Sequence, residues 1–388
     1  MIVRQIVFDR FRNLDETTVL FCDGVNVLRG QNAQGKSNIL EGIYLFARGR
    51  SFRGAKAREM IRFGETSAAL RIRYSGEGDV ADTPLEIQLF SNNSRKYFRR
   101  GAPLKGAREM IGGFRAVLFC PSHLSLACGS PAVRRSYLDI AISQISPAYM
   151  DDLAKYQRIM LHRNSLLKDA YAGRRVSSEE WDSFAVMLSS FGARIASERM
   201  RYTRLAAAAS ADVFRLMTAG LEVPEFTYSS AYMRTPAAEH LSAEAEKPLG
   251  AEVDRRISEM VRGLYTDHIE REIRLGSTLY GIHKDDIEIA LNGKDARLYA
   301  SQGQQRSLAL AMKLAEGELS KKITGEYPVF LLDDVLSELD SSRRNYVLSS
   351  LTGRQIIITS CDADLFQDFP GANIIGVEGG RIISPVSP

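Results

Sequence analysis

The chain has 388 residues, of which 45% are hydrophobic and 25% charged, and its formal net charge at pH 7 is +4. This length allows two or three domains with a sizeable core, and the composition excludes a disordered or fibrous protein. Because the net charge is small, any contact with nucleic acid must come from a local basic face. No apolar run approaches the ~18 residues that span a bilayer, and the first residues lack a signal-peptide layout, so we expect a cytoplasmic protein with no membrane partner.

The first third of the chain is rich in strand patterns. Alternating apolar residues predict strands over 2–8, 17–21 and 25–28, and helical spacing follows over 37–46. The stretch 67–100 alternates again, and its polar turn at 91–94 indicates an antiparallel hairpin.

The middle of the chain has helical spacing, and strand patterns return near the C-terminus. The proline-free stretch 181–220 carries apolar residues at intervals of three and four, which predicts a helical arm that packs along one stripe from Phe184 to Leu216. A strand is expected over 287–291, a helix over 308–319, and buried strands over 329–332 and 355–359. The four cysteines have no metal-binding spacing, which indicates free thiols.

A phosphate-binding loop follows the strand 25–28. Its residues are Gly30, Gln31, Asn32, Ala33, Gln34, Gly35, Lys36 and Ser37, which fit G-x-x-x-x-G-K-[ST]. In such loops the glycines let backbone N–H groups surround a phosphate, the lysine adds charge and the serine reaches Mg²⁺. The preceding strand and following helix give the context that this motif requires.

Two carboxylates at the other end of the chain complete the same site. Asp333 and Asp334 end a buried apolar strand, so we expect Asp333 to hold Mg²⁺ through water and Asp334 to orient the attacking water. The alternative is a pair of solvated carboxylates. Because nearly the whole chain separates them from the loop, one nucleotide site must be built from both termini, with the middle inserted as a separate body.

A third motif opens the helix near residue 302. In the segment 301–306, Ser301, Gly303 and Gln304 lie where helix N–H groups and the helix dipole face an anion. An ordinary helix cap is the alternative. Since one phosphate loop is already present, a second anion site suggests a nucleotide shared between two subunits.

These motifs, with Ser337-Glu338-Leu339-Asp340 after the carboxylate strand, resemble the head domain of an ABC-type ATPase. Their division between the termini is similar to the SMC-like branch of DNA-repair ATPases, and more narrowly to the RecF family. The residues that carry the narrower resemblance are Phe11-Arg12-Asn13, Gly129-Ser130-Pro131, Arg134-Arg135, Leu138-Asp139, Tyr156, Arg163-Asn164 and Gly281-Ile282-His283-Lys284-Asp285-Asp286.

The resemblance implies an α/β fold. An ATPase head would be built from 1–119 and 286–388, with an inserted, mainly helical lobe over 120–285. It implies ATP and Mg²⁺ as cofactors, with Arg12 and Asn13 joining the phosphate loop, and Lys36 and Asp334 acting in catalysis.

The resemblance also implies a function in recombinational repair. An ATP-dependent homodimer, closed by the serine motif of each subunit, would clamp double-stranded and gapped DNA, and weak, DNA-stimulated hydrolysis would release it. RecR and RecO are the implied partners in loading recombinase onto single-stranded DNA.

The sequence departs from the family pattern at several positions. Asp334 stands where ABC-type ATPases usually have Glu, Thr359-Ser360 replace the switch His, and no Gln occurs in 119–123. Ile282 and Lys284 replace the usual Pro and Arg, which removes a bidentate fork but keeps the charge.

Some roles stay open from the sequence. His283 fits a structural or inter-lobe role better than a catalytic one. Two basic stretches suit either DNA phosphates or a solvated face: Arg95-Lys96 with Arg99-Arg100, and Arg48, Arg50, Arg53, Lys56 and Arg58. Another SMC-like ATPase, from defence or a nuclease complex, and a small-molecule phosphotransferase remain as alternative functions.

Overall fold

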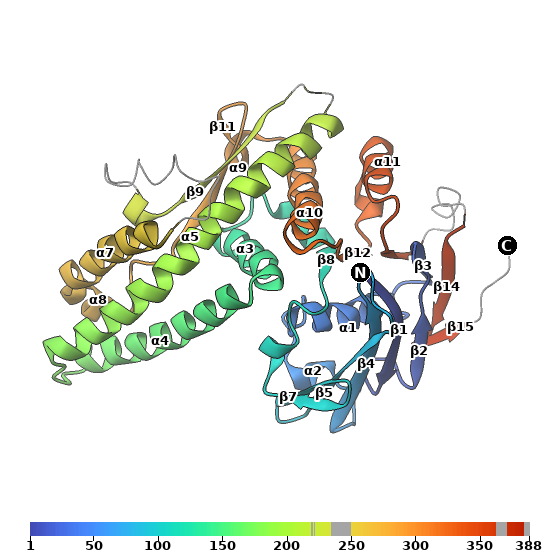
Figure 1. Cartoon of the computed structure of the whole chain (residues 1–388), viewed down its shortest axis with the longest axis horizontal. Helices are drawn as coiled ribbons and strands as arrows, with labels where there is room; N and C mark the ends of the chain where they lie inside the picture. The colour runs from blue at the N-terminus through green and yellow to red at the C-terminus, as the bar shows by residue number, and fades with distance from the viewer. Residues whose placement is uncertain (219, 221, 234–249, 362–370, 384–388) are drawn as a thin grey trace. The chain divides into compact units, whose positions relative to one another are not determined.

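The computed structural model describes residues 1–218, 220, 222–233, 250–361 and 371–383. The chain forms two compact units, Met1–Ser125 with Ala309–Pro388, and Leu126–Leu308 (Figure 1). The first unit therefore contains both ends of the chain, and the second is an insertion within it. Within the described residues, every helix is too short or too polar to cross a membrane.

The first unit contains an antiparallel sheet made by the N-terminal part alone. Its order is β2 (Thr17–Leu20), β1 (Ile2–Asp9), β4 (Ser67–Ser75), β5 (Thr83–Phe90), β6 (Arg95–Arg99) and β7 (Ala102–Leu104). The predicted hairpin is confirmed, because β5 and β6 pair with Leu89 opposite Arg95.

The second sheet of this unit interleaves strands from both ends of the chain. Its order is β15 (Arg381–Ile383), β14 (Asn373–Glu378), β3 (Val25–Arg29), β13 (Ile356–Ser360), β12 (Val329–Asp333) and β8 (Ala116–Phe119). All neighbours except β14 and β15 pair in parallel. Every residue of β12 and β13 is buried, as expected for parallel strands covered on both faces. The predicted assembly of the head from both termini is confirmed.

Helix α1 (Lys36–Arg48) lies between the two sheets. It contacts β4 of the antiparallel sheet and β8, β12 and β13 of the parallel one. Because it is covered on all sides, its sequence is apolar around nearly the whole circumference. Among the described residues, the remaining helices of the unit are α2 (Ala57–Met60), η1 (Ala107–Glu109), η2 (Pro121–Ser125), η4 (Leu336–Glu338), α11 (Ser341–Ser350) and most of α10 (Gln302–Thr324).

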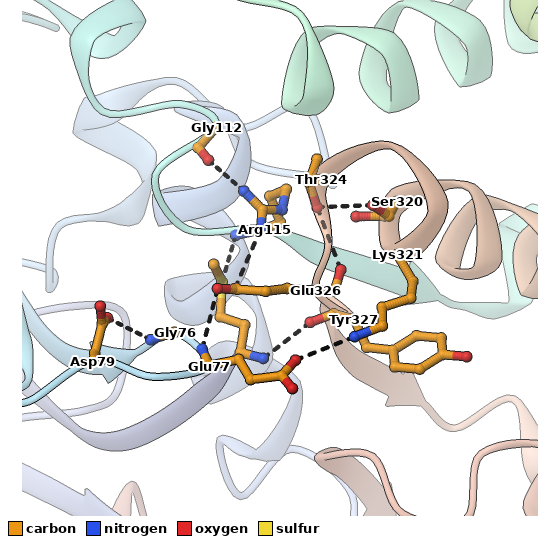
Figure 2. A network of polar contacts seen from close by, with 11 residues as sticks. Gly76, Glu77, Asp79, Gly112, Arg115, Ser320, Lys321, Thr324, Glu326 and Tyr327 are labelled. Carbon is orange, nitrogen blue, oxygen red and sulfur yellow. Dashed lines mark hydrogen bonds and ion pairs between the residues drawn. The ribbon is translucent and has the colours of Figure 1, made fainter.

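A polar network provides a second tie between the sheets (Figure 2). Arg115, just before β8, lies 3.3 Å from the Glu326 carboxylate in the connection between α10 and β12. The other Glu326 oxygen accepts a 3.1 Å hydrogen bond from the Glu77 N–H in the turn after β4, and the Glu77 carboxylate pairs with Lys321 at 3.1 Å. Burial is the largest influence on Arg115 and lowers its pKa. The network thus fixes the β4–β5 turn against the end of α10 and the connection from α10 to β12.

The second unit packs helices on a small antiparallel sheet. The sheet has the order β11 (Lys294–Asp295), β10 (Asp286–Leu291) and β9 (Pro224–Ser229). The predicted helical arm is the 40-residue helix α5 (Ser178–Met217), and its stripe is buried at Leu188, Ile195 and Tyr202. The predicted end of the stripe is wrong, because Leu216 is 70% exposed. The other elements in the described part of this unit are α3 (Pro131–Ile145), α4 (Pro147–Tyr171), η3 (Ala231–Met233), α7 (Ala251–Asp267), α8 (Ile269–Leu275) and α9 (Ala296–Tyr299).

The second unit extends further along the chain than the sequence suggested. The expected lobe ended at residue 285, but β10 pairs along its whole length with β9, from Asp286 opposite Ser229 to Leu291 opposite Pro224. The segment 286–308 therefore belongs to this unit, and the chain re-enters the first unit within α10. The pairing partner of a strand is a long-range property, so the local pattern did not reveal this boundary.

We predict that the contact between α1 and the antiparallel sheet tolerates no extra methyl group. A Cβ on Gly42 would lie 2.3 Å from the Phe8 ring, which is itself fully buried, so Gly42→Ala should lower the free energy of unfolding by about 1–3 kcal/mol. Gly263→Ala on α7 is the matched control, because nothing lies within 4 Å of its new Cβ. That variant should gain about 0.5–1 kcal/mol. Denaturant unfolding of both variants measures the difference, and equal effects would contradict the packing.

Candidate functional site

The phosphate loop joins the end of β3 to the start of α1. Ala33 and Gly35 have φ of +64° and +113°, and these left-handed residues turn successive backbone N–H groups toward one point. Gly35 caps α1 without a side-chain hydrogen bond. The first N–H groups of an α-helix have no partner within the helix, so this end of α1 is a ready anion site.

Both fixed glycines of the loop are sterically required. A Cβ on Gly30 would lie 2.2 Å from the Val377 carbonyl oxygen of β14, and the Gly30 N–H donates to the Ser360 carbonyl at 3.4 Å. A Cβ on Gly35 would lie 2.9 Å from the Asn13 side chain. The loop therefore begins in a gap that the C-terminal strands leave for it.

Lys36 lies within the curve of the loop. Its side-chain Nζ donates to the carbonyls of Gly30 and Gln31 at 2.7 and 2.8 Å, and the residue is only 4% exposed. These contacts fix the ammonium group beside the N–H groups of the loop, where it adds positive charge to the anion site.

Segments from both ends of the chain hold the outer side of the loop. The Gln34 carbonyl accepts hydrogen bonds from Asn13 Nδ2 at 3.1 Å and from the Gly380 N–H at 2.9 Å, and Gln34 Oε1 accepts from the Gly379 N–H at 2.6 Å. Asn13 therefore binds the loop backbone in this structure. Gly379 and Gly380 escaped the sequence analysis, although the Gly-Gly pair marks a tight turn between two strands.

Arg12 makes its contacts with protein acceptors. Its Nε and Nη2 lie 3.1 and 2.9 Å from the two oxygens of Glu41, and its Nη1 donates to the Glu59 carbonyl at 2.7 Å. Glu41 lies on α1 with a fully buried side chain, and it also accepts from Ser51 Oγ at 2.5 Å. The structure thus gives Arg12 a supporting position, and a direct contact with a nucleotide stays a prediction.

The two carboxylates lie at the end of β12 and are organised by Thr359. The Thr359 hydroxyl donates to Asp333 Oδ1 at 3.1 Å and accepts from the Asp334 N–H at 2.9 Å. Asp334 has a φ of +51°, so the chain turns sharply just after the strand. Thr359 stands where the resemblance led us to expect a histidine. It is a site residue that the motif search missed.

The loop and the carboxylates meet at one edge of the parallel sheet. β3 and β12 are the two neighbours of β13, so their carboxyl ends lie close together. Burial raises the pKa of Asp334, the Asp333 carboxylate raises it further, and the Lys36 ammonium opposes both. The half-buried Ser37 hydroxyl and the Asp333 carboxylate, which is only 7% exposed, are oxygen donors of the type that Mg²⁺ takes beside phosphate. These donors fit the expected metal.

The serine motif forms a reciprocal cap at the start of α10. Ser301 Oγ accepts from the Gln304 N–H at 3.3 Å, and Gln304 Oε1 accepts from the Ser301 N–H at 2.6 Å. Ser301 is exposed, and the preceding Leu298 and Tyr299 are 65% and 70% exposed. Within the chain the segment is therefore a helix cap, and the contact with a partner's nucleotide stays a prediction.

The segment 281–286 is part of a buried polar network in the second unit. Asp285 accepts from the hydroxyls of Tyr228 and Tyr232 at 2.5 and 2.7 Å. The ring nitrogens of His283 lie 2.9 Å from the Tyr156 hydroxyl and 3.0 Å from the Thr278 carbonyl. Burial raises the pKa of Asp285 to about 6 and lowers that of His283 to about 4. Both side chains support the loop that carries them, as the structural reading of His283 expected.

Other residues that carry the RecF resemblance hold the same loop. Arg134 on α3 makes two 2.7 Å contacts with the Asp286 carboxylate, and Arg163 on α4 forms a fully buried ion pair with Glu272 at 2.6 Å. Asn164 Oδ1 accepts from the Thr278 N–H at 2.8 Å. Their shared task is to fix the chain before β10 against α3, α4 and α8.

The sequence model of the protein family described as the RecF/RecN/SMC N-terminal domain matches residues 2–381 of this chain. A protein named "DNA replication and repair protein RecF" from Ruminiclostridium cellulolyticum is 34% identical over 99% of this chain and 100% of its own length. One of the same name from Thermoanaerobacter sp. is 36% identical over 92% of this chain and 94% of its own. The chain belongs to the RecF family.

Solved structures agree with this membership. The "recombination mediator protein RecF-ATPrS in RecFOR pathway" has a TM-score of 0.88 and 33% identity over 98% of this chain and 97% of its own. The corresponding "RecF-ATP" structure has a TM-score of 0.86 and 34% identity over 98% and 96% of the two chains. An SMC head bound to the C-terminal winged-helix domain of ScpA, at 15% identity and a TM-score of 0.55 over 99% and 97%, shares the fold. The α/β ATPase-head fold of the RecF family is thus confirmed.

We predict opposite pH effects for Asp285 and His283. The folded-state pKa of Asp285, about 6, lies above its ordinary 3.8, so its contribution to the free energy of unfolding falls as pH rises through that interval. The pKa of His283, about 4, lies below its ordinary 6.5, so its contribution rises with pH over that interval.

Both effects are tested by the thermal unfolding midpoints of Asp285→Asn, His283→Gln and the parent chain, measured from about pH 4 to 6.5. The thermal midpoint of Asp285→Asn minus that of the parent should rise with pH. The midpoint of His283→Gln minus that of the parent should fall with pH. Parallel curves for all three proteins would show that neither group changes its pKa on folding.

Proposed function

We propose that this chain is an ATP-dependent DNA-binding protein of recombinational repair and replication-fork maintenance. The observation that carries the proposal is the single site at which the loop with Lys36 and the carboxylates of Asp333 and Asp334 meet. Relatives similar over the whole length are named as RecF, and similar structures are named as RecF with ATP or ATPrS. The donors and the charge of this site suit a nucleoside triphosphate.

Each part of the site has a task in this proposal. The N–H groups of 30–37 surround the phosphates, and Lys36 places its charge on them. Ser37 and Asp333 would hold Mg²⁺, which would neutralise charge on the phosphates. Asp334 would orient the attacking water and accept its proton. Burial raises the pKa of this carboxyl, and the Asp333 carboxylate raises it further.

A second copy of the chain completes the proposed site. The exposed Ser301, with Gly303 and Gln304 at the start of α10, would contact the phosphate bound by the partner, and the exposed Leu298 and Tyr299 supply apolar area around it. Closure of this homodimer would clamp double-stranded or gapped DNA, and weak, DNA-stimulated hydrolysis would reopen it. The similarity to RecF extends the proposal to RecR and RecO as partners in recombinase loading.

The role of Asp334 is tested by a substitution that keeps its size. Asp334→Asn should bind ATP but lose turnover by roughly 10²-fold or more, since the amide cannot accept the proton. The variant should also accumulate as the ATP-bound dimer in sedimentation. Asp212→Asn removes an exposed carboxylate on α5 and is the control, with unchanged turnover expected. Parental turnover in Asp334→Asn would place the base elsewhere.

The trans contact is tested by Ser301→Arg. A bulky cation at this exposed position should leave ATP binding to the single chain intact but abolish ATP-dependent dimerisation. Ser177→Arg is the matched control, because Ser177 is also an exposed serine cap, accepting from the Glu180 N–H at 3.2 Å, on helix α5.

Mixing Ser301→Arg with Lys36→Ala sharpens this test. Their heterodimer holds one composite site with an intact loop and an intact serine motif, so part of the turnover should return. If Ser301→Arg dimerises with ATP as the parent does, the motif is only a helix cap.

A further inference from the structure

A cavity of about 380 Å³ lies on the small antiparallel sheet of the second unit, and all of its lining residues belong to that unit. Along β10, Ile287, Ile289 and Leu291 are buried, whereas Glu288 is exposed. Because side chains alternate along a strand, Ala290 lies on the same outer face as Glu288. The cavity is therefore a hollow in the face of the sheet that is turned away from the core.

Ala290 lies at the centre of this hollow. It pairs with Glu225 of β9 on one side and with Asp295 of β11 on the other, and Glu288 precedes it by two residues on its own strand. Neighbouring strands are about 4.8 Å apart, and two residues span about 6.7 Å along a strand. Three carboxylates thus surround one methyl group, with no larger side chain between them.

The carboxylates outnumber the cations that face the cavity. Arg134 is already bound to Asp286 through two 2.7 Å contacts, so this pair is neutral. The other charged lining residues are three carboxylates and one guanidinium, which sum to −2: Glu225, Glu288, Asp295 and Arg297. The chain as a whole carries +4, so this face has the opposite sign and would repel the phosphates of DNA.

The arrangement is costly for the protein alone. Like charges on neighbouring positions of a sheet destabilise it. Within the described part of the chain, the Glu225 carboxylate has no ion pair or hydrogen bond that would offset this repulsion. A cation placed over Ala290 would reduce the repulsion between all three carboxylates at once.

We propose that Glu225, Glu288 and Asp295 around Ala290, the carboxylate cradle, bind an arginine side chain from a basic segment of a partner protein. The planar guanidinium offers five donors in a fixed fork, which suits several carboxylates around one point. Small-molecule sites are mostly apolar, whereas this lining is mostly charged, which favours a side chain presented by a larger partner. The inference goes beyond the proposed function, because it requires neither ATP nor DNA.

The Ala290 methyl group can report this contact directly. The full-length protein, labelled with ¹³C at its alanine methyl groups, is titrated at low salt with the tripeptide acetyl-Gly-Arg-Gly-amide. The Ala290 signal, identified by its loss in Ala290→Ser, should shift and reach a plateau. The same tripeptide with citrulline in place of arginine is the matched ligand, since it keeps the shape and loses the charge. It should leave the signal unchanged.

Substitutions that remove one charge test the cradle residues. Glu225→Gln and Glu288→Gln keep the size of each side chain, and each should weaken binding of the arginine tripeptide roughly fivefold. Glu259→Gln on α7 is the matched control, because Glu259 is a carboxylate of the same unit, 62% exposed, and does not line the cavity. That variant should bind the tripeptide as the parent does.

Two further measurements separate loss of binding from loss of folding. Glu225→Gln relieves repulsion, so its thermal midpoint should exceed that of the parent at low salt, and the gain should vanish at about 1 M salt. Ala290→Arg places a guanidinium of the chain itself in the cradle. It should raise the thermal midpoint and abolish binding, which is measured here by saturation transfer to the tripeptide.

Several results would overturn the inference. An Ala290 signal that ignores the arginine tripeptide, or that responds equally to the citrulline one, shows that no guanidinium is bound there. Parental affinity in both Glu225→Gln and Glu288→Gln excludes the cradle. A blunt DNA duplex or Mg²⁺ that shifts the signal as the tripeptide should would assign the face to nucleic acid or to a metal ion instead. Because each arm omits nucleotide, the proposed function stands or falls by its own tests.

Discussion

The parallel pairing of β3 with β13 and β14 is the constraint on which the rest of the structure depends. β3 comes from the first thirty residues, and both of its neighbours come from the last thirty-five. Gly30 is wedged against β14, and Gly379 and Gly380 hold Gln34 from outside. The shape of the loop therefore depends on contacts with the C-terminal strands, so an intact site requires both ends of the chain.

The same pairing explains why the carboxylates and the loop share one site. Because β13 separates β3 from β12, its next-to-last residue can contact both aspartates at the end of β12, and this residue is Thr359. A hydroxyl at this position can donate to one aspartate and accept from the backbone of the other. The position thus has a structural task here, whether or not a histidine fills it elsewhere.

The parts that could be predicted from the sequence are those fixed by local chemistry. The phosphate loop has a fixed spacing, the buried strands are short apolar runs, and α5 repeats one apolar stripe over many turns. The sequence did not indicate contacts between distant segments, such as the pairing of β10 with β9, the bond from Gly379 to Gln34, or the buried Glu41 beneath Arg12. A motif identifies the groups that contact a ligand. The residues that hold those groups in place depend on packing between distant segments, and many residue types can occupy such positions.

The central claim is that two copies of the chain share each ATP. The direct test is the ATP turnover per chain, measured at saturating Mg²⁺-ATP over a wide range of protein concentrations. A site completed by a partner predicts that turnover per chain rises with protein concentration and levels off when the dimer is saturated. Turnover per chain that stays constant down to concentrations at which sedimentation shows only monomer would contradict the account.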